Sequence, residues 1–167
     1  LAYAWDEGIQ HETFPLLADG EALFEASRFE GAQRVRLPDG PGHGAALCLP
    51  ARQRWAGTSL RYFPGDWRAY RRLSYRVYLP RPTPLALGLR IDDLAHVRRG
   101  QLSDDRYNGR VLLQPGWNTL TLDLDTMRKT AGGRRMDLSQ IHHLRWFTLE
   151  TLDGNQCFIL DELRLLP

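Results

Sequence analysis

The sequence lacks the long apolar runs of membrane-spanning segments and the Cys/His motifs of zinc sites. No run of about 18 apolar residues occurs, so we expect no segment to cross a bilayer. The two cysteines, Cys48 and Cys157, form no CxxC pair and no Cys/His cluster, which excludes the common zinc motifs. Each cysteine lies in an apolar, strand-like run, and the sequence leaves open whether they form a disulfide or stay as buried thiols.

Lysine is almost absent as well, because Lys129 is the only lysine among 22 basic residues. Against 20 acidic residues the formal net charge is +2, which is too small to indicate a nucleic-acid partner. Arginine suits carboxylates, phosphates and sugar hydroxyls, but codon usage in a high-GC genome explains an arginine excess equally well. With 167 residues, 43% of them hydrophobic, we expect one soluble domain that spans residues 1–167.

Helical periodicity is scarce, whereas the alternation of apolar and polar residues that is typical of strands recurs along the chain. Within residues 73–80, Leu73, Tyr75, Val77 and Leu79 fall on one face. Turn-forming residues separate this segment from further strand-like segments, namely residues 85–93, 109–114, 117–124, 141–150 and 157–166. Many short strands without a long amphipathic helix predict an all-β fold, a two-sheet antiparallel β-sandwich.

The order of the motifs resembles a known superfamily. "FPGDWRAYRRLSYRVYLP" is followed by "LALGLRIDD", "DDRYNGR", "LQPGWNTLTLDL" and the closing "CFILDELRL". This series resembles the galactose-binding-like jelly-roll superfamily, and in particular the carbohydrate-binding modules appended to bacterial glycosidases and surface proteins. It covers roughly residues 45–167. The resemblance implies a jelly roll, a glycan or polysaccharide partner and an extracytoplasmic location (periplasmic, secreted or cell-surface). It also implies attachment to a hydrolase domain or a membrane segment outside this sequence.

Polar residues gather between two of the strand-like segments, and we expect them to form a ligand site at one end of the sandwich. Asp and Asn side chains suit vicinal hydroxyls, Tyr107 can stack on a pyranose ring, and Arg106 can reach a ring oxygen or an acidic sugar. The alternative is a solvated loop whose side chains pair with one another. The candidates are Asp92, Asp93, His96, Asp105, Arg106, Tyr107 and Asn108.

The second candidate surface is the side of the sheet that faces away from the core. Side chains that alternate with core residues on neighbouring strands form one patch, although a shift of one residue in register exchanges the two faces. The patch would contain Arg76, Tyr78, Arg90 and Asp92, joined from a later strand by Trp146 or by Arg145 with Glu150.

The resemblance also implies a structural calcium, although no cofactor is required. Related modules often carry a calcium ion that bridges the first and last strands, and Asp161 matches the ligand position in the last strand. Its partner would come from the N-terminal part, with Glu7, Glu12 and Glu30 as candidates. Pairing of Asp161 with an arginine is the alternative.

The leading interpretation is a non-catalytic carbohydrate-binding module. The sequence contains no GxSxG, no HExxH and no phosphate-binding glycine loop. Glycoside hydrolysis needs two carboxyl groups about 5 to 9 Å apart, one of them with a raised pKa, and neighbouring aspartates on a wet loop rarely meet that demand. Two alternatives remain, a structural or protein-interaction domain of the cell envelope and a jelly-roll glycosidase or lyase.

Overall fold

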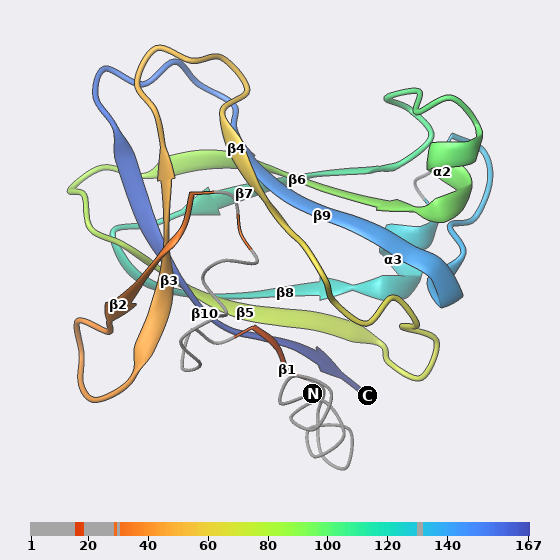
Figure 1. Ribbon diagram of the computed structural model, residues 1–167, viewed down its shortest axis with the longest axis horizontal. Coiled ribbons are helices and arrows are strands. Elements are labelled where there is room, and N and C mark those ends of the chain that lie inside the picture. Colours follow the sequence, from red (N-terminus) through yellow and green to blue (C-terminus); the bar gives the residue numbers. More distant parts are fainter. Residues whose placement is uncertain (1–15, 19–28, 30, 130–131) are drawn as a thin grey trace.

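A computed structural model describes residues 16–18, 29, 31–129 and 132–167, which form two antiparallel sheets packed face to face (Figure 1). The first sheet has the strand order β2-β3-β10-β5-β8, with β1 also paired to β10, and the second has the order β4-β9-β6-β7. The strands are β1 (Leu16–Ala18), β2 (Gln33–Arg36), β3 (His43–Leu49), β4 (Gly57–Leu60), β5 (Arg72–Leu79), β6 (Leu85–Asp93), β7 (Tyr107–Leu113), β8 (Gly116–Asp123), β9 (Ile141–Thr148) and β10 (Gln156–Leu166). The prediction of an all-β, two-sheet jelly roll is therefore confirmed.

The core lies between the two sheets and follows from the alternation in the sequence. Leu73, Tyr75, Val77 and Leu79 of β5 are all buried, while the residues between them lie on the outer side. Trp146 of β9 is also in the core, 1% exposed, and its ring meets the Tyr75 ring edge-on at a centroid distance of 5.5 Å. Large aromatic side chains of this kind supply much of the apolar area that holds two sheets together.

An aspartate caps the N-terminus of each of three short helical segments. Helix α2 (Leu94–Arg98) has Asp93 as its N-cap, and α3 (Leu124–Arg128) has Asp123. In each case the side chain accepts a hydrogen bond from a backbone N–H of the first turn, which satisfies a donor that the helix leaves unpaired. Asp137 caps a single 3-10 turn at Leu138–Gln140 in the same way. Helices α2 and α3 lie at the same end of the sandwich (Figure 1).

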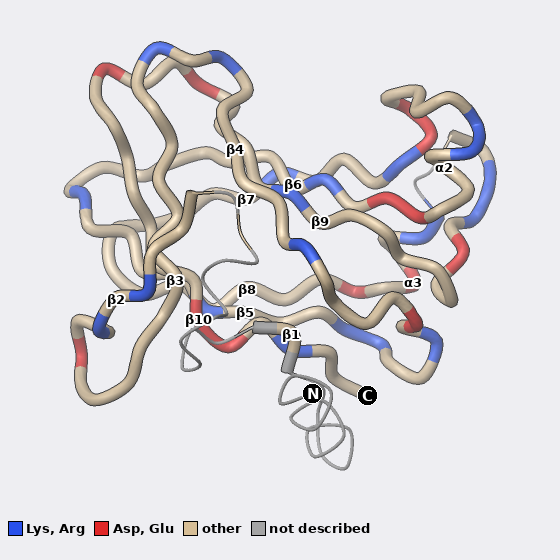
Figure 2. Tube along the Cα trace, in the orientation of Figure 1, with Lys and Arg blue, Asp and Glu red and all other residues tan. Residues whose placement is uncertain are grey.

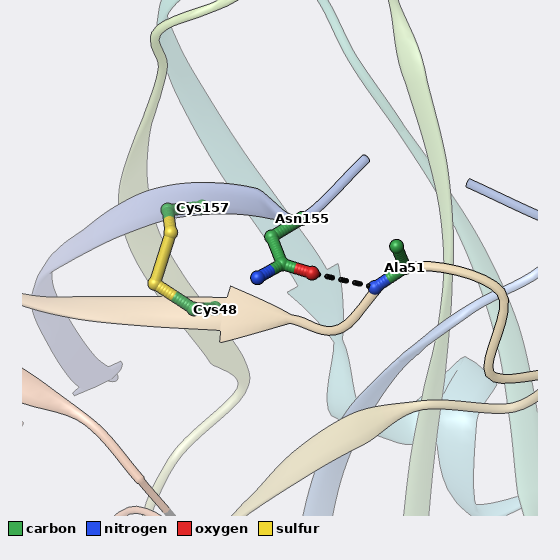
Figure 3. Close-up of a disulfide and its surroundings, with 4 residues drawn as sticks. All are labelled: Cys48, Ala51, Asn155 and Cys157. Atoms are coloured by element: carbon green, nitrogen blue, oxygen red, sulfur yellow. Dashed lines mark hydrogen bonds between the residues drawn. A yellow bond between two sulfur atoms is a disulfide. The ribbon is translucent and has the colours of Figure 1, made fainter. Parts of the chain in front are cut away.

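A disulfide joins Cys48 to Cys157, which answers the question that the sequence left open (Figure 3). The two residues are directly opposite in the β3–β10 pairing, with a Cα–Cα distance of 4.0 Å. Beside the bond, the Ala51 N–H donates to the Asn155 side-chain oxygen at 2.8 Å. The disulfide therefore ties the central strand β10 to β3 across a sequence separation of 109 residues.

Within the ranges named above, the structure has no helix of the length and apolarity that crossing a bilayer requires. The assignment of residues 1–167 to one domain stays a prediction, because residues 1–15, 19–28, 30 and 130–131 are outside the described part.

Candidate functional site

Two of the candidate loop residues are held together by one arginine, and a third contacts one of them. Arg134, from the segment between α3 and β9, donates to both carboxylate oxygens of Asp93 at 2.8 Å and to Asp105 Oδ1 at 2.6 Å. His96 is fully buried in α2, and its Nδ1 lies 2.9 Å from the backbone oxygen of Asp105. These side chains hold the end of the sandwich together. Asp93, His96 and Asp105 therefore pair within the protein, as in the alternative to a ligand site that the sequence left open.

The electrostatics of this cluster agree with a structural role. Burial raises the pKa of Asp93. Hydrogen bonds from Arg134 and from the backbone N–H groups of Asp137 and His96 lower it by more, so the net pKa is about 2. The hydrogen bond from Arg134 likewise lowers the pKa of Asp105. Both groups are therefore carboxylates at neutral pH and are occupied by protein donors.

Tyr107 lies on the core-facing side of β7, which corrects its expected place beside Arg106 and Asn108. It is opposite Ile91 in the β6–β7 pairing and packs against the hydrophobic core. Its ring lies over Gly109, where a Cβ would clash with it. Burial raises the pKa of its hydroxyl. A sugar bound to the outer side of the sheet is therefore out of its reach.

The expected patch of Arg76, Tyr78, Arg90 and Asp92 is divided between two sheets. Strand β5 belongs to the first sheet and β6 to the second, so their outer faces point in opposite directions. Arg76 and Tyr78 instead surround Trp117, with the Arg76 guanidinium carbon 4.0 Å from the ring centroid and the Tyr78 ring 5.4 Å away. Trp146, also expected on the patch, is buried in the core.

Four of the candidates do come together, on the outer side of the second sheet. Arg90 and Asp92 project from β6, and Asn108 lies at the start of β7 opposite Arg90. Arg106 directly precedes β7, and its Nε donates to Asn108 Oδ1 at 2.9 Å. Arg145 on β9, which the sequence offered as an alternative to Trp146, lies beside them, whereas sequence reasoning missed two further neighbours, Ser59 on β4 and His143 on β9. We call this surface, with the aromatic residues described below, the outer face of β6.

Hydrogen bonds connect these side chains across three strands. Asp92 is 1% exposed, and its Oδ2 lies 3.1 Å from Arg90 Nε and 3.3 Å from His143 Nδ1. His143 Nε2 lies 2.8 Å from the Ser59 hydroxyl, which also accepts from Arg145 Nη1 at 3.2 Å. Such a network holds each side chain in one orientation before any ligand arrives.

The charge state of Asp92 follows from the same contacts. Burial raises its pKa, but the hydrogen bond and charge of His143 and the charge of Arg90 lower it by more, so the net pKa lies below its ordinary value. Asp92 is therefore an anion that orients its neighbours, because a carboxyl group that donates a proton needs a raised pKa.

Two aromatic side chains lie beside this polar network. Phe147 is opposite Gly88 in the β6–β9 pairing, and its ring lies so close that a Cβ at Gly88 would clash with it. Trp55, in the segment before β4, is 51% exposed and lies 5.9 Å from Phe147 between ring centroids. The alternation of Leu144 with Arg145 in the sequence could have placed Phe147 on the outer side, whereas no periodic signal marks Trp55.

The outer face of β6 thus presents an aromatic platform next to a fixed row of polar side chains.

No protein-family model and no curated protein matches the sequence. Solved structures do match. The chain has the jelly-roll fold of carbohydrate-binding modules.

Three structures illustrate this shared fold. A family 11 module from Clostridium thermocellum, in complex with a β-1,3-1,4-mixed-linked tetrasaccharide, has a TM-score of 0.60 at 15% identity over 90% of this chain and 94% of that one. An exo-β-agarase has a TM-score of 0.68 at 15% identity, over 91% of this chain and 24% of that chain. A family 28 module specific for non-crystalline cellulose has a TM-score of 0.57 at 6% identity, over 81% and 80% of the two chains. Identities this low establish a common fold and leave the ligand to be argued from this chain's own residues.

The implied calcium site has one member in the described structure. Asp161 is buried in β10, and its Oδ2 lies 3.9 Å from Arg76 Nη1, which is the arginine pairing considered as the alternative. Within the described residues, no three or more His, Cys, Asp or Glu side chains are grouped so as to hold a metal ion. Glu7, Glu12 and Glu30 lie outside those residues, so the calcium site stays a prediction.

Proposed function

We propose that this chain is a non-catalytic carbohydrate-binding module that holds a glycan on the outer face of β6. One observation carries the proposal: the Phe147–Trp55 platform adjoins the polar network of Arg90, Asp92 and Arg145 on one sheet. A pyranose ring has an apolar face of C–H groups and a rim of hydroxyls. It therefore fits a surface that offers an aromatic ring and, beside it, side chains that donate and accept hydrogen bonds.

The rigidity of the surface supports the proposal. Strands β4, β6 and β9 carry most of these side chains, and the hydrogen bonds among them fix their rotamers. A site built on paired strands is preorganised, so a weak ligand loses little affinity to ordering of the protein.

A binding role without catalysis is supported by the carboxyl groups. On the outer face of β6, Asp92 is the one acidic side chain among the described residues, and its pKa is lowered. Asp93 and Asp105 form the buried carboxyl pair nearby, but Arg134 binds both. A glycosidase needs one carboxyl group with a raised pKa, and none of these three has one.

The disulfide supports the proposed extracytoplasmic location in a bacterial protein. Structural disulfides persist in secreted proteins, the periplasm and at cell surfaces, and are rare where thiol reductants are abundant. The Cys48–Cys157 bond joins two strands of the sheet rather than a mobile segment, which is typical of a structural bond.

Affinity electrophoresis in polysaccharide gels, followed by calorimetry with the best ligand, tests the proposal. We expect Trp55→Ala and Phe147→Ala to weaken binding about tenfold or more, because each removes part of the stacking surface. Gly88→Ala should weaken binding as well, since its Cβ displaces the Phe147 ring.

The matched control is Trp117→Ala, which removes an aromatic ring from the outer face of the first sheet. Its affinity should equal that of the unaltered chain. Loss of binding in Trp117→Ala with full binding in Trp55→Ala would contradict the proposal, because it would place the site on the outer face of the first sheet. Absence of binding to every neutral and acidic polysaccharide would favour the interaction-domain alternative.

A further inference from the structure

A cavity lies at the end of the sandwich that carries α3, and none of its lining residues belongs to the outer face of β6. Its volume is about 360 Å³, at the small end of the range of ligand pockets, about 300 to 1,000 Å³. In Figure 2, basic and acidic segments lie close together where the loop before β5 approaches α3. The cavity is lined by Arg68, Tyr70, Arg71, Asp123, Leu124, Asp125, Arg128 and Leu138.

Backbone hydrogen bonds join the segments that form the walls of this cavity. The Arg71 N–H donates to the Leu166 oxygen at 2.8 Å, and the Arg71 oxygen accepts from the Leu124 N–H at the same distance. The Trp67 N–H donates to the Leu138 oxygen at 2.7 Å. Because the walls are fixed by the fold, a ligand would lose little affinity to their ordering.

Part of the lining is apolar. Leu124 and Leu138 are core residues, 1% and 7% exposed, and both also line the cavity. Tyr70 lines it too, is partly buried and packs against the same core. These three side chains form a surface that suits the apolar body of a small molecule.

Some of the charged side chains at the cavity are already paired. Arg68 donates through Nε to Asp66 Oδ1 at 2.9 Å and through Nη2 to Asp66 Oδ2 at 2.7 Å. Lys129 donates to Asp125. This hydrogen bond is the largest cause of the lowered pKa of Asp125, to which Arg128 contributes by charge alone. The Arg68–Asp66 and Lys129–Asp125 pairs therefore balance each other's charges.

Two guanidinium groups at the cavity are not paired in this way. Among the residues that the structure describes, neither the Arg71 nor the Arg128 side chain forms a hydrogen bond or an ion pair. Arg128 is half-buried, and its Nε is shielded from solvent without an acceptor. One further carboxylate lines the cavity, that of Asp123, whose Oδ1 accepts from the Thr126 N–H as the N-cap of α3. Two guanidinium groups thus face one carboxylate.

Unpaired guanidinium groups in a cavity indicate the chemistry of a ligand. A shielded N–H without an acceptor costs free energy, so native proteins pair such groups with protein, water or ligand atoms. Water can accept a hydrogen bond, but it does not balance the charge of two guanidinium groups. Carboxylate and phosphate groups do both, because their oxygens match the paired donors of arginine.

We infer that this cavity binds a small organic anion, with its carboxylate or phosphate group between Arg71 and Arg128 and its body against Leu124 and Leu138. The small volume sets the size of the ligand at about that of a monosaccharide. The site is separate from the outer face of β6, so it goes beyond the proposed binding of a glycan there.

Calorimetry with matched pairs of small molecules tests the inference. Glucuronate is compared with glucose, which lacks the carboxylate, and phenyl phosphate with phenol, which lacks the phosphate. Inorganic phosphate serves as an anion without a body. We expect at least one organic anion to bind about tenfold or more tightly than both its neutral partner and inorganic phosphate. Preference within the first pair identifies a carboxylate ligand, and preference within the second a phosphate.

Charge variants locate the bound anion. Arg71→Gln and Arg128→Gln should each weaken its binding about tenfold and change binding of the neutral partner less than about twofold. Arg71 is exposed, so Arg71→Gln keeps the test valid even if replacement of the half-buried Arg128 disturbs the fold. Arg36→Gln is the control, because it removes the same charge from an exposed position on β2 and should leave the affinity unchanged.

The outcomes distinguish this site from the glycan site. Equal affinity for the anions and their neutral partners, or for inorganic phosphate, overturns the inference, as does equal loss in Arg36→Gln and Arg71→Gln. Loss of anion binding in Trp55→Ala with full binding in Arg71→Gln would assign the anion to the outer face of β6 and overturns it as well. Polysaccharide binding that depends on Trp55 and Phe147 leaves the proposed function intact in each of these cases.

Discussion

Asp92 and Asp93 are adjacent in the sequence but belong to different parts of the protein. Asp92 pairs with His143 in the β6–β9 register, whereas Asp93 pairs with Ile141, because the register shifts between them. Neighbouring residues of a strand point to opposite faces, so Asp92 lies on the outer face and Asp93 turns to the Arg134 cluster. The sequence grouped both in one polar loop, although alternation along β6 also predicted Asp92 on the outer side.

The Arg134 cluster yields a prediction at the residue scale. Arg134→Ala leaves the carboxylates of Asp93 and Asp105 buried without their cation, which is far more costly than loss of an exposed ion pair. We expect the free energy of unfolding to fall by about 2 to 4 kcal/mol, measured by urea unfolding with tryptophan fluorescence.

The neighbouring residue supplies the control for this prediction. Arg135 is exposed, so Arg135→Ala should change the free energy of unfolding by less than about 0.5 kcal/mol. Equal effects of the two substitutions would mean that the cluster contributes nothing beyond surface charge.

At the scale of elements, the connection between β5 and β6 decides which residues share a face. Residues 80–84 carry the chain from the first sheet to the second, so the outer sides of these consecutive strands point apart. Alternation within each strand correctly separated core from outer residues in both. The pairing of β6 with β9 and of β5 with β10 depends on contacts between distant segments, and local patterns do not encode it.

The β3–β10 disulfide gives a prediction at the element scale. Replacing Cys48 and Cys157 together by serine removes a bond that closes a long loop in the unfolded chain. We expect a loss of about 2 to 4 kcal/mol in the free energy of unfolding, because the unfolded chain gains conformational freedom. Urea unfolding with and without reductant measures it.

Reductant provides the internal comparison for the disulfide. It should destabilise the unaltered chain by the same amount and leave the double serine variant unchanged. A reduced chain as stable as the oxidised one would show that pairing of β3 with β10 does not depend on the bond.

At the scale of the whole molecule, the two outer faces differ in chemistry. One carries Trp117 with Arg76 between acidic side chains, and the other carries Phe147 and Trp55 beside the hydrogen-bonded network of Arg90, Asp92 and His143. The α2–α3 end is closed by buried carboxylates whose pKa values lie below the ordinary range. Stability of the whole fold is therefore linked to the ionisation of this end.

Acid should destabilise the protein through these carboxylates. The pKa of Asp93 is about 2 in the folded chain and 3.8 in its ordinary state, so the unfolded chain binds more protons between those values. Its stabilising contribution, about 2 kcal/mol, is complete above about pH 5 and is lost as the pH falls towards 2. Urea unfolding at a series of pH values measures the loss.

Asp93→Asn tests the assignment of this acid sensitivity. The variant should be less stable at neutral pH, and its free energy of unfolding should fall less between about pH 5 and about pH 2 than that of the unaltered chain. Identical pH dependence in both chains would assign the effect to other carboxylates.

The sequence by itself determined the secondary structure and the separation of core from surface, because both depend on neighbours one to four residues apart. It therefore predicted the sandwich and the buried faces of β5 and β6. Only the tertiary structure decided which strands lie side by side, where the β6–β9 register shifts, and that Tyr107 faces the core. A binding face is assembled from β4, β6, β7 and β9, whose pairing is fixed by packing across the whole sandwich.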